Sequence, residues 1–196
     1  MREIAPRLHH WTAPHPGHVP DPDPGSAADW PEQVGSVLYQ APDAAVFIDP
    51  QVPGELWPEL DEHVAGRSVV VLATLPSHGR CRPAVLARYD GVAIRPDASM
   101  PAGVDALAFP RFDETMYWLP GPRALVPGDR LLGDGAGGLR LCPESWLRYL
   151  GIDDVVDELR AALKPLLELP VEHVLVSHWE PVVGGGHAAL RRALGG

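Results

Sequence analysis

The chain has 196 residues, enough for one compact domain with its own core, and 45% of them are hydrophobic, which excludes a wholly disordered chain. Its formal net charge of -10 argues against non-specific nucleic-acid binding, which requires basic side chains that displace counterions from phosphates. Two cysteines, Cys81 and Cys142, are too few for a disulfide framework or a four-cysteine zinc site, and they are typical of a reducing cytoplasm.

The opening residues, MREIAPRLHHW, contain no apolar segment of the kind that a signal peptide needs, and no apolar run approaches the length of a membrane span. We therefore expect one domain over residues 1–196, in the cytoplasm, with neither nucleic acid nor membrane as a partner. Arginine is common while lysine is nearly absent, a bias typical of a GC-rich bacterial genome. The sequence leaves the oligomeric state open.

The elements predicted along the chain start with strands that flank a long loop. Residues 14–31 are rich in Pro, Asp and Gly and predict this loop, whose length is typical of a lid or binding loop. Apolar and β-prone segments predict strands at 34–40, 44–48, 68–73, 104–109, 115–119, 124–126, 139–141 and 173–176. Helical patterns occur at 54–65, 83–88, 153–169 and 186–194. Because strands and helices come in runs, a layered α+β sandwich fits better than a Rossmann fold.

Four segments at the ends of predicted strands carry chemistry-bearing residues. VFIDP contains Asp49, VVVLATLPSHGR leads into a turn at 74–80, RALVPGDRLLG contains Asp129, and HVLVSHWEPV contains His178. In this order and spacing, and over nearly the whole chain, they resemble the metallo-β-lactamase superfamily. The resemblance implies a four-layer αββα sandwich in which imidazoles and carboxylates hold one or two zinc or iron ions. In such proteins the metal activates water for hydrolysis.

The metal motif departs from the pattern of that superfamily. Its Thr-His-x-His-x-Asp-His turn aligns on Thr74, and the four ligand positions are occupied here by Leu75, Ser77, Gly79 and Arg80. His78 is near these positions but out of phase with them. A further histidine expected before the strand at 115–119 is missing from residues 110–113. Among the ligands that the resemblance implies, only Asp129 and His178 are present.

This loss of ligands predicts a protein without a cofactor that binds a small molecule, or an atypical enzyme. Asp129 then needs a positive partner, because a buried unpaired carboxylate is costly. We predict that Arg80 takes the place of the metal charge, with Arg111 as the second candidate; the alternative is that Arg80 caps the turn or faces solvent. The candidate pocket residues are Asp49, His78, Arg80, Asp113, Asp129 and His178.

Two other functions remain open. One is a single-metal hydrolase whose zinc or iron is held by Asp129, His178 and His78; the other is a vestigial site with a structural or interaction role. Each candidate also has a structural interpretation. Asp129 could belong to a Gly-Asp turn, His178 to a strand end, His78 to an exposed loop, and Asp49 to the support of the turn at 74–80.

Several remaining patterns have weaker functional interpretations. Four histidines stand near the start of the chain, namely His9, His10, His15 and His18. They could complete a metal site if this arm folds over the pocket, whereas a solvated arm has no such role. We interpret Cys81 as a structural thiol rather than a nucleophile, and Gly133–Gly138 as a hairpin turn rather than a dinucleotide loop. Most of the aromatic residues are expected in the core, including Tyr117, Trp118, Trp146 and Trp179.

Overall fold

A computed structural model describes all residues from 1 to 196 and contains two main β-sheets. The first sheet comprises, in order, β1 (Arg2–Ala5), β2 (Leu8–Pro14), β3 (Gln33–Gln40), β4 (Ala44–Ile48), β5 (Ser68–Leu72) and β6 (Val92–Ala93). The second comprises, in order, β13 (Val182–Val183), β12 (His173–Val174), β9 (Ala124–Val126), β8 (Glu114–Leu119) and β7 (Asp105–Phe109). A separate hairpin joins β10 (Leu131–Gly133) to β11 (Leu139–Leu141). The four helices are α1 (Trp57–Val64), α2 (Arg82–Tyr89), α3 (Val155–Leu163) and α4 (Gly186–Ala193).

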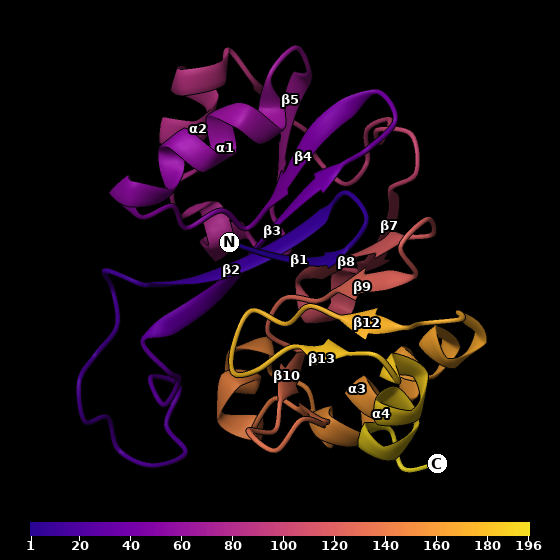
Figure 1. Cartoon of the computed structure of the whole chain (residues 1–196). Helices are drawn as coiled ribbons and strands as arrows, with labels where there is room; N and C mark the ends of the chain where they lie inside the picture. The colour runs from indigo at the N-terminus through magenta and orange to yellow at the C-terminus, as the bar shows by residue number, and fades with distance from the viewer.

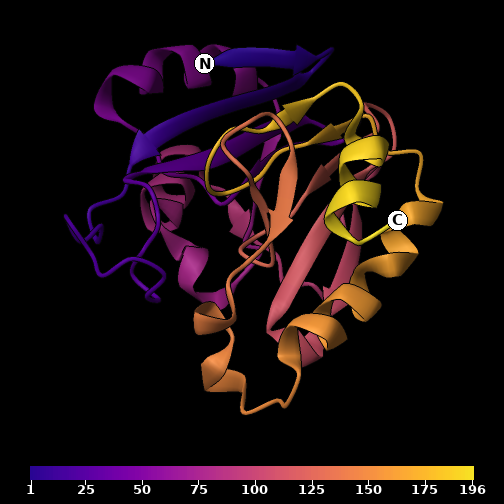
Figure 2. The same ribbon diagram turned by 90° about the horizontal axis from the view of Figure 1, so that it is seen from below.

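Helices α1 and α2, the two sheets, and helices α3 and α4 form four layers, which confirms the predicted α+β sandwich (Figures 1 and 2). Three apolar clusters fill the spaces between these layers. The first cluster lies between α1 and α2 and one face of the six-stranded sheet, and includes Phe47 and Leu60. The second lies between the two sheets, where Ile48 packs with residues of β8 and β9. The third lies between the five-stranded sheet and α3 and α4, and includes Leu159 and Leu190. Burial of these clusters is the main favourable contribution to folding.

Strand β8 shows how the sequence specifies two of these layers at once. All six of its residues are buried. Tyr117 and Leu119 point into the layer between the sheets, whereas Met116 and Trp118 point toward α3 and α4. Side chains alternate between the two faces of a strand, so a strand covered on both faces reads as a continuous apolar run.

The N-terminal hairpin of β1 and β2 was not predicted. Strand β2 pairs with β3 over its whole length, from Leu8 opposite Tyr39 to Pro14 opposite Gln33. His9 and His10 are buried within this strand, so this part of the arm is not solvated. The predicted loop at 14–31 follows directly and connects β2 to β3.

Two predicted helices are shorter than expected. The helix predicted at 153–169 ends as α3 at Leu163 and continues as a 3-10 turn, Lys164–Glu168. Pro165 lies within this turn and has no backbone N–H to extend the α-helical bonding pattern. The helix predicted at 54–65 begins with a 3-10 turn, Gly54–Leu56, and becomes α-helical only at Trp57. Each helix falls short of the length and apolar character that crossing a membrane requires.

The two sheets are tied together where β3 begins and β12 ends. The backbone N–H of Gly35 donates to the carbonyl of Ser177 at 2.7 Å, and Val34 forms an isolated bridge with His178. A Cβ added to Gly35 would lie 2.3 Å from the carbonyl oxygen of Val176, so only glycine allows this approach. The close contact holds the loop that carries His178 against the edge of the first sheet.

Candidate metal centre

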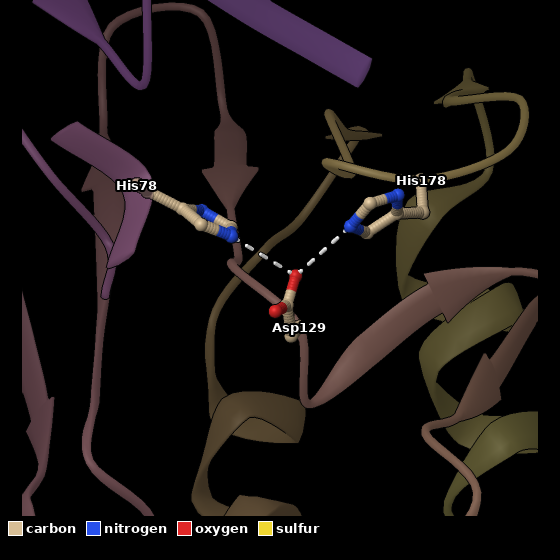
Figure 3. Close-up of side chains that lie close together, drawn as sticks. All are labelled: His78, Asp129 and His178. Atoms are coloured by element: carbon tan, nitrogen blue, oxygen red, sulfur yellow. Dashed lines mark ion pairs between the residues drawn. The ribbon is translucent and has the colours of Figure 1, made fainter. Parts of the chain in front are cut away.

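Three side chains from separate loops converge at one edge of the sandwich (Figure 3). His78 follows β5, Asp129 lies between β9 and β10, and His178 follows β12. The Nε2 atoms of His78 and His178 lie 3.2 and 3.3 Å from Oδ1 of Asp129. All three atoms lie within 4.8 Å of one another, so this cluster could hold a metal ion.

The Oδ1 atom of Asp129 is buried and accepts no hydrogen bond, although two imidazole nitrogens lie close to it. Buried carboxylate oxygens normally have a partner, and an orphaned one requires an explanation. The donor set of two imidazoles and one carboxylate is one that zinc and iron accept. In a tetrahedral site with bonds of about 2.0–2.1 Å, neighbouring ligand atoms are about 3.3–3.4 Å apart, close to the two N–O separations of 3.2 and 3.3 Å found here. The residues present therefore fit a single metal ion.

His78 enters the cluster because of the local backbone. Pro76–Gly79 forms a 3-10 turn, which buries the His78 side chain and leaves Ser77 exposed. The residue that is out of phase with the superfamily motif in sequence thus joins Asp129 and His178 in space. Simple counting from Thr74 could not reveal this, because it assumes the backbone of the intact motif.

Asp49 orients His78 from behind. Its Oδ2 lies 2.8 Å from Nδ1 of His78, and its Oδ1 accepts the backbone N–H of Thr74 at 2.8 Å. Asp49 is buried and does not line the cavity. A carboxylate that binds the second nitrogen of a ligating histidine fixes the tautomer and ring direction, as in many metal sites.

Electrostatics couple these groups. Burial opposes protonation of His78, but the charges of Asp129 and Asp49 outweigh it and raise the pKa of His78 to about 9. Burial raises the pKa of Asp129, yet the charge of His78 brings it well below its ordinary value. Burial lowers the pKa of His178, which keeps its imidazole neutral. Without a metal, His78 therefore supplies the positive charge that Asp129 requires.

Glu114 holds the loop that carries Asp129. Its buried carboxylate accepts the backbone N–H groups of Gly128 at 3.1 Å, Asp129 at 2.8 Å and Arg130 at 2.9 Å. Burial, only partly offset by the charge of Arg130, raises the pKa of Glu114 to about 7. Glu114 was not among the predicted site residues, although a carboxylate at the start of the apolar strand ETMYWL was a usable signal.

Arg80 does not form the expected ion pair with Asp129. Its Nη1 donates to the carbonyl oxygens of Gly35 at 2.5 Å and Asp49 at 2.9 Å, and these two bonds hold the guanidinium against the backbone of the first sheet. Arg80 nevertheless lines the cavity beside the cluster. Arg111 is no substitute, because it is exposed and pairs with Glu158 at 2.7 Å.

The cluster opens into a cavity of about 500 Å³ with an aromatic wall. The rings of Trp30 and Trp146 lie 5.5 and 5.6 Å from that of His178, measured between centroids. Trp146 Nε1 also donates to the carbonyl of Ser26 at 3.2 Å, which attaches the loop at 14–31 to the cavity rim. Tyr117, Trp118 and Trp146 belong to the core clusters, and Trp179 packs against one of them partly buried. Trp146 lines the cavity as well.

Asp113 and the N-terminal histidines lie around the cluster and not within it. Asp113 is exposed and lines the cavity. His15 also lines it, and His18 packs against Trp30 with 5.2 Å between ring centroids. His9 and His10 lie on β2, and neither joins the cluster. The hypothesis that this arm completes the metal site is therefore not realised in the structure.

Cys81 and the glycine-rich segment have structural surroundings. The Cys81 thiol lies 3.5 Å from the side-chain oxygen of Gln51, and no carboxylate or imidazole is hydrogen-bonded to it. Gly133–Gly138 connects β10 to β11, as expected for a hairpin turn. Within it, Asp134 accepts the backbone N–H groups of Ala136 and Gly138, which closes the turn.

Solved structures with a similar fold include metallo-β-lactamases. A metallo-β-lactamase from Erythrobacter litoralis superposes with a TM-score of 0.62 and 12% identity, covering 99% of this chain and 93% of that one. The DIM-1 metallo-β-lactamase superposes with a TM-score of 0.59 and 12% identity, covering 99% of this chain and 95% of that one. A metallo-β-lactamase family protein from Thermus thermophilus superposes with a TM-score of 0.54 and 14% identity, covering 98% of this chain and 78% of that one.

The chain therefore has the metallo-β-lactamase fold. At these identities the likeness shows the fold alone, because one fold supports many activities and function depends on the site. No protein-family profile and no curated protein sequence matches the chain.

Proposed function

We propose that the protein is a hydrolase that uses a single zinc or iron ion, held by His78, Asp129 and His178. The observation that carries this proposal is the buried Oδ1 atom of Asp129, which lacks a hydrogen bond and lies beside two imidazole nitrogens. The resemblance to metallo-β-lactamases supports it, because the three residues lie at strand ends of the same fold.

A metal bound there would supply Lewis acidity to activate water and polarise the substrate. The chain's own residues have distinct roles around it. Asp49 holds His78 in one orientation, and Glu114 fixes the loop of Asp129 through three backbone bonds. Trp30 and Trp146 cover His178 and reduce the access of bulk water, which strengthens electrostatic interactions within the cavity.

Cobalt substitution tests the ligand set directly. Metal-free protein purified without an affinity tag is titrated with Co²⁺, and the visible ligand-field spectrum reports coordination. We expect a saturable spectrum at one ion per chain, lost in Asp129→Ala and His178→Ala. His173→Ala is the matched control, because this histidine lies on β12, outside the cavity, and should leave the spectrum unchanged. A wild-type spectrum that survives Asp129→Ala would refute the ligand set.

A second function is favoured by the position of His78 between two carboxylates, 2.8 Å from Asp49 and 3.2 Å from Asp129. In that arrangement an imidazolium balances Asp129 without a metal, and the cavity serves as a small-molecule binding site. The cobalt titration separates the two functions. Absence of any saturable spectrum in the folded wild-type chain supports the metal-free binding protein and rejects the metallohydrolase.

A further inference from the structure

We infer that Arg80 binds an oxyanion of the ligand, a carboxylate or a phosphoryl group, at the wall of the cavity. This inference rests on the proposed function in that it names the substrate class for the same site. The nitrogen atoms of the guanidinium differ in their hydrogen bonding within the chain. Its Nη1 atom is anchored by two backbone carbonyls, those of Gly35 and Asp49, whereas the buried Nε atom has no partner.

The free side of Arg80 has the shape that oxyanions require. Nε and Nη2 point along one edge of the planar guanidinium, and together they form the fork that binds two oxygens of a carboxylate or phosphate. Neither atom donates a hydrogen bond within the chain, and the side chain lines the cavity. A buried donor without an acceptor is unfavourable, so an acceptor supplied by a ligand would correct a real deficit.

Arg130, the other arginine of the cavity, does not compete for this role. Its Nε donates to the carbonyl of Phe112 at 2.9 Å, and its Nη2 donates to the hydroxyl of Tyr149 at 2.6 Å. Both atoms of its side edge are therefore occupied by the protein. Arg80 is the arginine of this cavity whose side edge remains free.

The rest of the cavity indicates what is attached to the oxyanion. Trp30, Trp146 and Tyr149 line it, and flat apolar groups pack well against such rings. The carboxylate of Asp129 also lies in the cavity, so a ligand that brings its negative charge to Arg80 should carry no second negative charge. The ligand class is thus a compact, planar or apolar molecule with one oxyanion.

Binding of three simple probes to metal-free protein tests this inference. Benzoate, phenyl phosphate and neutral benzamide share one ring, and their affinities are measured by NMR titration after dialysis against a chelator. We expect benzoate or phenyl phosphate to bind at least roughly tenfold more tightly than benzamide, because only an oxyanion pairs with the guanidinium fork. The better of the two anions identifies the oxyanion. Equal affinity for all three, or no binding to wild type, would overturn the inference.

Two variants locate the effect. Arg80→Lys keeps the charge but loses the fork. It should weaken binding of the better anion by roughly fivefold or more and leave the affinity for benzamide unchanged. Arg111→Gln, at an exposed arginine outside the cavity, is the matched control and should change neither the anion affinity nor the benzamide affinity. An Arg80→Lys variant with wild-type anion affinity would contradict the assignment.

The wild-type comparison of probes does not depend on how well a variant folds. Because it uses metal-free protein, its outcome is also separate from that of the cobalt titration. Anion binding without cobalt binding would reject the hydrolase and retain the Arg80 site. Cobalt binding without anion binding would retain the metal site and reject the Arg80 site.

Discussion

At the scale of single residues, Asp49 acts on the candidate metal centre through His78. Its Oδ2 lies 2.8 Å from Nδ1 of His78, while the opposite nitrogen faces Asp129. A carboxylate in this position orients the imidazole and strengthens it as a ligand. Asp49 also accepts hydrogen bonds from Thr74, so the same side chain fixes the turn that carries His78.

We predict that Asp49→Asn lowers the affinity for zinc by roughly 10–100-fold, the usual effect of losing such a partner. Competition with a chromophoric chelator measures this affinity. Asp61→Asn is the matched control, because Asp61 pairs with Arg88 on the surface and does not line the cavity. Equal zinc affinity in wild type and Asp49→Asn would show that Asp49 has no role in orienting His78.

His10 should make folding sensitive to acid. Burial lowers the pKa of His10 from 6.5 to about 4, so below pH 6.5 the unfolded chain binds a proton that the folded chain excludes. The unfolding free energy therefore carries no penalty from His10 well above pH 6.5, and it falls as the pH decreases toward 4. Between pH 7 and 5 this one residue should cost about 2 kcal/mol of unfolding free energy.

The His10→Leu variant should lose that part of the pH dependence, since leucine does not titrate. Nε2 of His10 is buried without a partner, so the substitution removes no hydrogen bond at that atom. Urea unfolding of both proteins at pH 7, 6 and 5 measures the difference. Parallel curves of unfolding free energy against pH would contradict the prediction.

At the scale of elements, the junction between β3 and the end of β12 positions His178. Gly35 is in direct backbone contact with Val176 and Ser177. We predict that Gly35→Ala destabilises the protein by about 1–3 kcal/mol, because the new Cβ meets backbone that cannot rotate away. Chemical denaturation measures this, with Gly54→Ala as control, since nothing lies within 4 Å of a Cβ added there. Equal losses of unfolding free energy in Gly35→Ala and Gly54→Ala would exclude a special role for this junction.

The sequence predicted the elements better than the site that they build. Strand β8 is recognisable because residues 116–119 are continuously apolar. The strand ends that carry Asp49 and Asp129 are recognisable in the same way. His78 was a candidate pocket residue and the third ligand of the single-metal alternative, and the structure places it in the cluster. Counting from Thr74 left it out of phase with the motif, because its entry depends on a 3-10 turn. The predicted partner of Asp129 was wrong for a related reason. Arg80 is held by Gly35, which is distant in sequence and adjacent only after folding.

At the scale of the whole molecule, the cluster lies where both sheets and the loop at 14–31 meet, so a bound metal should stabilise the entire fold. At a free zinc concentration about one hundred times the dissociation constant, binding contributes about 2.7 kcal/mol. For a chain of this length that corresponds to a rise in melting temperature of about 5–10 °C. Calorimetry with and without a chelator measures the shift. The same shift in Asp129→Ala would place the stabilising metal elsewhere.

The central claim is that His78, Asp129 and His178 hold one metal ion, and the zinc stoichiometry tests it most directly. Tag-free protein is depleted of metal, equilibrated with zinc by dialysis, and analysed for metal per chain. We predict one zinc ion per wild-type chain and none tightly bound in Asp129→Ala. Two ions per chain, or a wild-type chain that retains no zinc while folded, would contradict the claim.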